Sequence, residues 1–368
     1  MKYYIIAGEA SGDLHGSNLI KQIRSKDHES VIRAWGGDEM QQAGADIVKH
    51  YRDLAFMGFL EVAMNLTTIL KNIKFCKEDI LGFEPDVLVL IDYPGFNMRI
   101  AEWAKNKGIK VVYYISPQVW AWKKGRVHKL KRDVDRMMVI LPFEPEFYRG
   151  YQMEVDYVGH PLLDAIEQLS EERKALPQEV DNGKKIIALL PGSRKQEITS
   201  MLSEMLKMVN EFPDYQFVVA GAPSQTKAFY KEIMGSSNIP VLFDKTYALL
   251  SHAHAALVTS GTATLETALF EVPEVVCYKG NPISFAIAKQ LVDIKFISLV
   301  NLIVDKELVK ELIQGDLNKK QLKRELEKCL DVNHREALIG EYRKMKEKLG
   351  SGGASAKAAE IVVQEARG

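Results

Sequence analysis

The stretch Leu189–Glu197, which reads LLPGSRKQE, decides the fold. Five apolar residues of buried-strand character, Ile186–Leu190, run directly into the turn Pro191–Arg194. Apolar residues then recur at spacings of three and four from Ile198 to Leu206, which is typical of an amphipathic helix. The turn therefore joins the carboxyl end of a strand to the amino terminus of a helix, where unpaired N–H groups and the helix dipole attract an anion.

The residues of this turn suit a diphosphate. Gly192 lets the backbone approach a ligand closely, Ser193 follows it, and Arg194 offers a planar, permanently charged fork. The turn matches neither of the two familiar phosphate-loop fingerprints. An ordinary strand–turn–helix corner with a solvated arginine therefore stays an open alternative.

A second turn of the same kind follows the apolar run Ala255–Val258. It reads TSGTATLE over Thr259–Glu266, so glycine and hydroxyl groups are followed by a carboxylate one helical turn later. This composition suits a phosphate together with a ribose. The predicted contacts are Gly261, Thr262, Thr264 and Glu266.

The order strand, loop, helix repeats along the whole chain and predicts an α/β fold of two Rossmann-like domains, whose parallel sheets face a central cleft. The polar segment Glu167–Lys185 marks the boundary, which gives domains 1–165 and 166–344. The C-terminal helix, about 345–368, is expected to pack back on the first domain. The expected strands are 3–7, 32–37, 86–91, 111–115, 137–141, 186–190, 216–220, 241–243, 255–258 and 274–278.

Composition narrows the function. The 49 basic and 49 acidic residues among 368 balance, which gives no support to nucleic-acid binding. The cysteines Cys76, Cys277 and Cys329 are far apart, which suits a reducing cytoplasm. The first apolar run is a strand rather than a signal peptide, and no apolar run approaches the roughly 18 residues of a membrane span.

Asp92 is the candidate catalytic group of the first domain. It closes the apolar strand Asp86–Ile91, and open α/β sheets place ligands and catalysts at the carboxyl ends of their strands. An aspartate at this position also makes a good helix cap, which is the structural alternative.

Two segments are candidates for contact with lipid. Phe56–Leu66 is apolar on nearly every side, so a buried helix competes with a lipid-facing surface. Lys123–Arg132 holds six basic residues and no acidic one beside two tryptophans, which indicates a solvated helix face or contact with anionic lipid or a phosphate. The predicted lipid-facing residues are Phe56, Met57, Phe59, Leu60, Met64, Lys123, Lys124 and Arg126.

Asp133 and Asp135 imitate the D-x-D metal motif of one class of sugar transferases. They precede an apolar strand, Met137–Leu141, instead of following one, so we interpret them as helix-end polarity and predict no metal site.

Eight short motifs occur in order along the chain: GEASGD (8–13), FMG..EV (56–62), D.P.FN (92–97), SPQVWAW (116–122), PFE (142–144), GHPL (159–162), LPGSR..E (190–197) and SGTATLE (260–266). Together they resemble the lipid-A-disaccharide synthase family of inverting GT-B glycosyltransferases.

The resemblance implies transfer of 2,3-diacylglucosamine from UDP-2,3-diacylglucosamine to 2,3-diacylglucosamine 1-phosphate, with no cofactor and no metal. The product carries a β-1,6 linkage, and UDP is released. The resemblance also implies a cytoplasmic enzyme held peripherally on the inner face of the cytoplasmic membrane, and it is compatible with a homodimer. The rivals are a UDP-sugar 2-epimerase of the same fold and a non-catalytic binder of UDP-sugars or lipids.

The resemblance also suggests roles for individual residues. Asp92 becomes the general base, Arg194 and the helix amino termini at Gly192 and Gly261 stabilise the leaving diphosphate, and Glu266 accepts the ribose hydroxyls. Asn301 matches a family asparagine near the nucleotide. The predicted acceptor-side residues are Glu9, Ser11, Gly12, Glu61, Asn97, Gln118 and His160.

Overall fold

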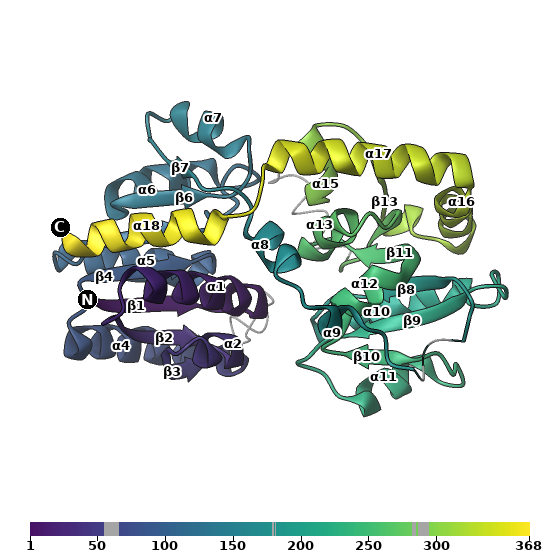
Figure 1. Cartoon of the computed structure of the whole chain (residues 1–368), viewed down its shortest axis with the longest axis horizontal. Coiled ribbons are helices and arrows are strands. Elements are labelled where there is room, and N and C mark those ends of the chain that lie inside the picture. Colours follow the sequence, from purple (N-terminus) through teal and green to yellow (C-terminus); the bar gives the residue numbers. More distant parts are fainter. Residues whose placement is uncertain (55–65, 179, 181, 282–284, 286–293) are drawn as a thin grey trace. The chain divides into compact units, whose positions relative to one another are not determined.

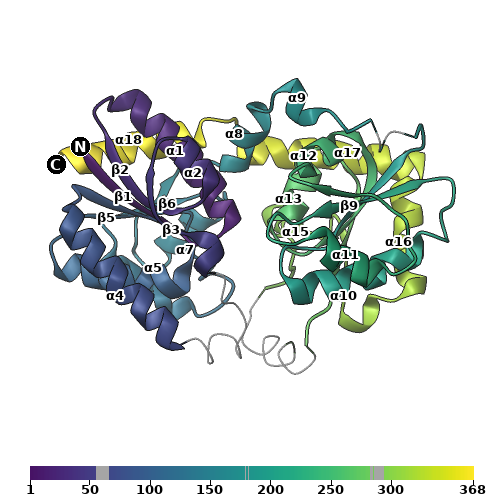
Figure 2. The same ribbon diagram turned by 90° about the horizontal axis from the view of Figure 1, so that it is seen from below.

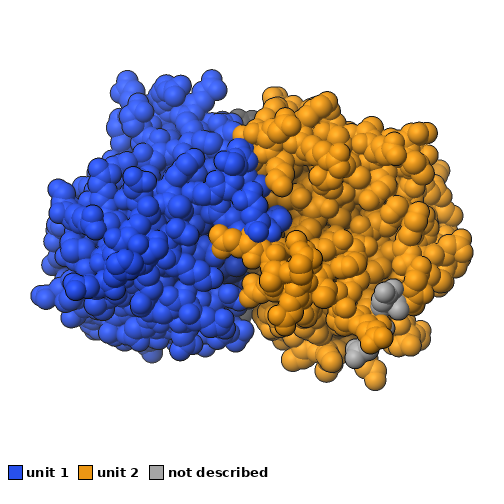
Figure 3. Space-filling model, viewed as in Figure 1, with its two compact units in different colours: residues 1–167, 350–368 blue, residues 168–349 orange. Residues whose placement is uncertain are grey.

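A computed structural model of the chain describes residues 1–54, 66–178, 180, 182–281, 285 and 294–368. These residues form two compact units, Met1–Glu167 with Gly350–Gly368 and Gln168–Leu349 (Figure 3). In the part of the chain that is described, no helix is both long enough and apolar enough to cross a membrane.

Among the described residues, unit 1 forms a seven-stranded parallel sheet in the order β3-β2-β1-β4-β5-β6-β7 (Figure 1). The order reverses between the neighbours β1 and β4, and open α/β sheets bind ligands beyond the carboxyl ends of such strands. Ala7 pairs with Ile91, so the residues that follow them leave the sheet side by side. The strands are β1 (Lys2–Ala7), β2 (Val31–Gly36), β3 (Asp46–His50), β4 (Val87–Ile91), β5 (Val111–Tyr114), β6 (Arg136–Val139) and β7 (Asp156–Tyr157).

Helices cover both faces of this sheet, because successive strand side chains point to opposite sides. Tyr4, Leu88 and Leu90 pack with the helices α4 and α5 on one face, while α1 and α18 lie together on the other (Figure 2). The helices are α1 (Ala10–Lys26), α2 (Asp38–Gln42), α4 (Leu66–Phe83), α5 (Pro94–Asn106), α6 (Val127–Asp133), α7 (Glu144–Arg149), α8 (Pro161–Glu167) and α18 (Ala354–Arg367).

Unit 2 repeats the design with a six-stranded parallel sheet, again counting described residues, in the order β10-β9-β8-β11-β12-β13. Its order reverses between β8 and β11, where Leu190 pairs with Val258. The strands are β8 (Ile186–Leu190), β9 (Gln216–Gly221), β10 (Val241–Phe243), β11 (Ala253–Thr259), β12 (Glu274–Tyr278) and β13 (Lys310–Ile313).

The two faces of this second sheet carry separate apolar cores. Ile187 and Leu189 pack with α10 and α16 on one face, and Ala188 and Leu190 pack with α12 on the other. The helices are α9 (Glu171–Lys174), α10 (Lys195–Met205), α11 (Lys227–Met234), α12 (Thr246–His252), α13 (Thr262–Leu269), α15 (Leu299–Val304), α16 (Lys319–Leu330) and α17 (Val332–Leu349).

The predicted fold class, parallel α/β sheets in a GT-B type chain, is confirmed by this architecture. The strands β3, β7 and β13 were not expected from the sequence. All three are at the ends of their sheet orders, and they are short or carry charged residues. Edge strands of this kind lack the continuous apolar run that identifies a buried parallel strand.

Candidate active site

Asp92 stands just beyond β4 in a left-handed backbone conformation, with φ of 44°, and Tyr93 follows it with φ of 49°. Each such residue costs about 1–2 kcal/mol relative to an ordinary conformation. Hydrogen bonds to two carbonyl groups hold the turn. The Asn97 side chain donates to Ile91 O at 3.2 Å and to Asp92 O at 2.8 Å, and the Tyr113 hydroxyl donates to Asp92 O at 2.6 Å. Asp92 is therefore fixed by buried neighbours.

The sequence around the turn explains why it forms. Gly8, which follows β1, lies against the Tyr93 ring, and a Cβ at position 8 would come within 2.4 Å of that ring. Pro94 begins α5 directly after the turn, a position that proline favours. Tyr93, not Asp92, is the N-cap residue of α5, so the helix-cap alternative does not describe this turn.

The surroundings of Asp92 raise its pKa to about 7. Burial is the main cause, the negative charge of Glu9 adds to it, and a hydrogen bond from the Tyr93 backbone opposes it. Asp92 as a residue is nevertheless only partly buried. A carboxylate with a pKa near 7 that a substrate can reach is well suited to general-base catalysis near neutral pH.

Glu144 is a second unusual carboxyl group of unit 1 and was not among the predicted site residues. Its side chain accepts hydrogen bonds from Ile140 N at 3.0 Å, Leu141 N at 2.8 Å and the Trp120 indole at 3.3 Å. Burial raises its pKa to about 7, and the Asp92 charge contributes. The signal that could have found it is the PFE motif, which puts a glutamate just past the end of a strand.

The predicted acceptor-side residues of unit 1 fall into two groups. Asn97 and His160 are buried and serve the protein itself: Asn97 holds the Asp92 turn, and His160 Nδ1 accepts the Leu162 backbone N–H at the start of α8. Burial and the neighbouring His15 lower the pKa of His160 to about 3, so it stays neutral. Their predicted contact with the acceptor stays a prediction.

The other acceptor-side residues differ in exposure. Gln118 is exposed, Glu9 and Ser11 are partly exposed, and Gly12 is buried where α1 packs on β1. Glu61 lies outside the described residues, as do the predicted lipid-facing residues Phe56, Met57, Phe59, Leu60 and Met64.

The basic segment after β5 has an aromatic centre. The Trp122 side chain is 38% exposed, the Lys123 ammonium lies 4.5 Å from its ring centroid, and the Arg126 guanidinium lies 5.1 Å from it. Lys124 is exposed beside them. The cations are held against the indole by cation–π attraction, which concentrates positive charge around an exposed aromatic ring.

The D-x-D pair is engaged by the protein. Asp133 accepts two hydrogen bonds from the Arg132 guanidinium, and Asp135 accepts Val111 N at 2.9 Å and forms an ion pair with Lys105. Among the described residues, no three His, Cys, Asp or Glu side chains are grouped so that they could hold a metal ion.

The turn after β8 keeps its charged groups near solvent. Gly192 has φ of 100°, which favours glycine, and leads into α10. Ser193 is exposed, and the Arg194 guanidinium lies 3.0 Å from the Glu197 carboxylate in an exposed pair. Exposed pairs of this kind contribute little to stability, so a ligand can replace Glu197 as the partner of Arg194 at little energetic cost.

The turn after β11 lies beside it, because β8 and β11 are neighbours and a Cβ at Gly192 would sit 3.6 Å from the Thr259 methyl group. Thr262 is exposed at the start of α13. Thr264 is buried and its hydroxyl donates to Gly261 O at 2.9 Å, so it braces the turn; its predicted contact with UDP stays a prediction.

Glu266 lies one turn into α13, and one of its oxygens accepts the Tyr247 hydroxyl at 2.8 Å. Burial raises the pKa of Glu266, and the bond from Tyr247 opposes that rise. Tyr247 was not foreseen, because it lies on α12, 19 residues before Glu266, and only the fold brings the two together.

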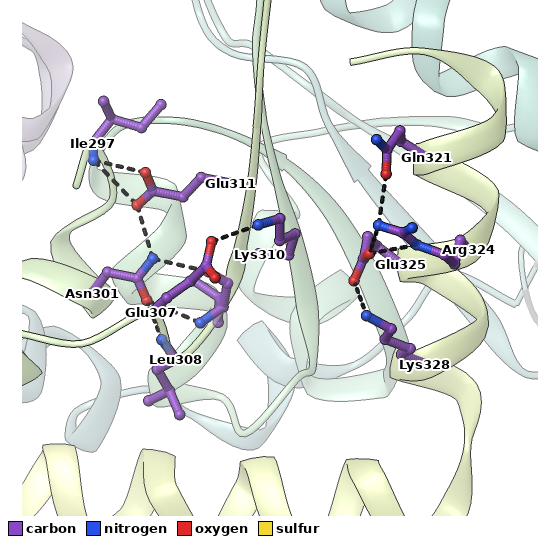
Figure 4. Close-up of polar contacts among 11 residues, drawn as sticks. Ile297, Asn301, Glu307, Leu308, Lys310, Glu311, Gln321, Arg324, Glu325 and Lys328 are labelled. Carbon is purple, nitrogen blue, oxygen red and sulfur yellow. Dashed lines mark hydrogen bonds and ion pairs between the residues drawn. The ribbon is translucent and has the colours of Figure 1, made fainter. Parts of the chain in front are cut away.

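Asn301 is fully buried, and its amide nitrogen and oxygen are both engaged inside the protein (Figure 4). Its nitrogen donates to Val309 O and to Glu311, each at 2.9 Å, and its oxygen accepts Leu308 N at 2.7 Å and Val309 N at 2.9 Å. Its predicted role near the nucleotide stays a prediction, and in this structure it holds a turn.

A pocket of about 580 Å³ opens near the ends of β12 and β13. Its lining includes Lys207 and Lys279, which both pair with Glu204, at 2.5 and 2.7 Å. The described lining contains none of the predicted UDP contacts, so this pocket is not the predicted diphosphate site.

Comparison with known proteins gives two kinds of likeness. The family model described as lipid-A-disaccharide synthetase matches residues 3–365. The curated lipid-A-disaccharide synthases of Geobacter metallireducens and Syntrophus aciditrophicus are 38% and 39% identical, over 98% and 96% of this chain and 96% and 95% of theirs.

Solved structures agree in fold at much lower identity. The UDP-GlcNAc 2-epimerase from Neisseria meningitidis bound to UDP-GlcNAc has a TM-score of 0.70 at 13% identity, covering 99% of this chain and 100% of its own. The glycotransferase of kitacinnamycin has a TM-score of 0.63 at 14% identity, covering 99% and 98%. At these identities, the two structures bear on the fold alone.

Proposed function

The chain belongs to the lipid-A-disaccharide synthetase family, and on that premise we propose how its residues carry out the reaction. The chain is a glycosyltransferase of lipid A biosynthesis. It transfers 2,3-diacylglucosamine from UDP-2,3-diacylglucosamine to 2,3-diacylglucosamine 1-phosphate with inversion, forms a β-1,6 linkage and releases UDP. The epimerase alternative is not favoured, because the epimerases share only the fold at low identity.

Asp92 takes the proton of the acceptor 6-hydroxyl. The observation that carries this proposal is a strand-end carboxylate with a pKa of about 7, partly open to solvent and fixed in a strained turn. An inverting transfer needs a single base, because the hydroxyl attacks the anomeric carbon from the side opposite the leaving group. Proton transfer of this kind contributes roughly 10²–10⁴ in rate.

The turns of unit 2 bind the nucleotide. Arg194 and the amino termini of α10 and α13 supply fixed positive charge to the diphosphate as it leaves, and Glu266 accepts the ribose hydroxyls. These groups do the work that a divalent cation does in other glycosyltransferases, so the reaction proceeds without a metal. The pairing of Asp133 with Arg132 and of Asp135 with Lys105 supports this proposal.

The test is UDP release from the donor, measured with and without the phosphorylated lipid acceptor and with and without EDTA. We expect release that requires the acceptor and is unchanged by the chelator. Conversion of the donor sugar without acceptor would favour an epimerase, and binding without turnover would favour a non-catalytic role. Loss of activity in EDTA, restored by Mg²⁺ or Mn²⁺, would contradict the metal-free reaction.

Unit 1 also makes peripheral contact with the cytoplasmic leaflet of the inner membrane. Both substrates carry acyl chains, so the enzyme meets them at a lipid surface. The exposed Trp122 ring is in contact with the cations of Lys123 and Arg126, and Lys124 is exposed nearby. This group combines an interfacial aromatic with basic charge, and reversible membrane binding needs two such signals.

Charge reversal tests this contact. Lys123→Glu with Arg126→Glu should weaken binding to vesicles containing anionic phospholipid, by at least about 1 kcal/mol per basic residue removed from the surface. Lys320→Glu with Lys348→Glu, two exposed lysines of unit 2, makes the same change in net charge and serves as the control. Equal loss in both pairs would mean that net charge, not this surface, governs binding.

A further inference from the structure

A chain of hydrogen bonds runs from the edge strand β13 to the turn after β11 in unit 2 (Figure 4 shows its outer part). At its outer end, the Glu311 carboxylate accepts Ile297 N at 3.1 and 3.0 Å, Ser298 N at 2.9 Å and the Asn301 amide nitrogen at 2.9 Å. Glu311 therefore fastens the start of α15 to β13 through three separate donors.

The inner end of this chain reaches the predicted diphosphate turn. The Ser260 hydroxyl donates to Ile297 O at 2.9 Å, and the Ser260 backbone N–H donates to Cys277 O at 3.1 Å. Ser260 directly precedes Gly261, the N-cap residue of α13. The residue that opens the turn is thus held on one side by the end of β12 and on the other by the segment that Glu311 fixes.

We propose that Glu311 is a positioning residue for the nucleotide, acting through Ile297 and Ser260 without touching the ligand. The proposal rests on the proposed function of the turn after β11 as a diphosphate site. Anion binding by backbone N–H groups depends on their orientation before the ligand arrives, because ordering a loop during binding lowers the affinity. Glu311 keeps that turn ordered in advance.

The chemistry of the cluster calls for a carboxylate. Ile297 and Ser298 present backbone N–H groups and Asn301 presents an amide nitrogen, so all three partners are donors. The Asn301 oxygen cannot help, because it already accepts Leu308 N and Val309 N. A glutamine at position 311 would bring one more donor into a group of donors, and an unsatisfied polar group near the protein interior is costly.

Glu311→Gln tests the proposal, and Glu307→Gln is its matched control. Glu307 lies four residues earlier and pairs with the Lys310 ammonium at the surface, at 2.7 Å (Figure 4). We expect Glu311→Gln to raise the Kd for UDP and the KM for the donor about tenfold, which corresponds to the loss of one well-made hydrogen bond, and to leave the acceptor KM unchanged. Glu307→Gln should leave all three constants unchanged.

A double-mutant cycle with Ser260→Ala tests the route. If Glu311 acts through Ser260, the double variant should bind UDP about as weakly as Glu311→Gln alone, because the link is already broken. Additive losses, or a normal Kd in Glu311→Gln, would overturn the proposal. Should Glu311→Gln fail to fold, Ser260→Ala breaks the same link from its inner end, and normal UDP binding by that variant would also overturn it.

The wild-type chain separates this proposal from the proposed function. If the wild-type chain does not bind UDP, the assignment of the turn itself fails. If the wild-type chain binds UDP and Glu311→Gln binds it equally well, only the positioning role fails. A role confined to stability would lower the melting temperature and leave the Kd for UDP unchanged well below the transition.

Discussion

The two sheets have the same strand order around their reversal points, yet the turns at those points carry opposite charge. In unit 1, the neighbours β1 and β4 are followed by the carboxylates Glu9 and Asp92. In unit 2, the corresponding neighbours β8 and β11 are followed by Gly192, Arg194 and the glycine–hydroxyl turn at Ser260. One scaffold therefore presents carboxylates in one unit and an arginine with glycine-containing turns in the other, and the proposed base and the proposed anion site rest on this difference in turn residues.

The two regions also differ in how strongly the surrounding protein buries and holds their charged side chains. Asp92 is strained, desolvated and braced by Asn97 and Tyr113, whereas Arg194 stands in solvent with an exposed partner. Desolvation brings a carboxylate to the basicity that proton abstraction requires. A diphosphate needs donors that it can reach.

Replacing the proposed base, Asp92, should have the largest effect. Asp92→Asn keeps the shape of the side chain, and asparagine tolerates the left-handed backbone, but the amide cannot take a proton. Turnover should fall by roughly 10²–10⁴ while the Kd for UDP stays near its original value. Steady-state kinetics together with calorimetric titration of UDP would measure both. Near-normal turnover with unchanged melting behaviour would remove Asp92 from the base role and direct attention to Glu9 or Glu61.

Removing the fixed charge of unit 2 should lower UDP affinity as well as turnover. Arg194→Ala loses a charge-assisted contact to the diphosphate, worth about 1.5–3 kcal/mol, so UDP affinity and turnover should fall together by about 10- to 150-fold. Lys207→Ala removes one charge close to the other end of α10 and should change neither. UDP affinity within twofold of the parent in Arg194→Ala would refute the anion site at this turn.

The sequence predicts the buried part of each sheet because continuous apolar runs such as Val87–Ile91 and Ile186–Leu190 are typical of strands covered on both faces. It predicts the turns because motif residues follow those runs directly. The edge strand β13 could not be predicted from the sequence. Its sequence KELI is half charged, and the residues of β12 with which it pairs lie about 35 residues earlier in the chain.

The residues that support the site are harder to predict than the residues that form it. Tyr113, Tyr247 and Glu311 each act through a hydrogen bond to a residue distant in sequence, so no local pattern marks them. Conversely, Asn301 and Thr264 sit in recognisable motifs, but the structure shows their polar atoms used within the protein. Motifs identify where chemistry takes place, and only the fold shows which motif residues face inward.

A smaller loss of kcat should follow from removing one of the hydrogen bonds that hold the Asp92 turn. Tyr113→Phe removes the hydroxyl that donates to Asp92 O, a bond worth about 0.5–1.5 kcal/mol, so kcat should fall about two- to tenfold with little change in KM. Tyr3→Phe, which removes a hydroxyl bonded to Asp27 near the opposite end of the sheet, should leave kcat unchanged. Equal kcat values for the two variants would show that the strained turn needs no support from Tyr113.

The smallest change should come from Glu9→Gln, which alters the pH dependence and not the maximum rate. With the Asp92 pKa at about 7, kcat/KM should rise through pH 7 and then level off, because only the ionised carboxylate accepts a proton. The Glu9 charge raises that pKa, so its removal lowers the pKa and moves the rise to lower pH. Glu102→Gln, whose carboxylate pairs with Arg132, should leave the profile in place. A shift of the Glu9→Gln profile to higher pH would mean that the ionisation controlling the rate belongs to a group other than Asp92. The contrast between the carboxylate turn of unit 1 and the arginine turn of unit 2 would then no longer be explained by a base in unit 1.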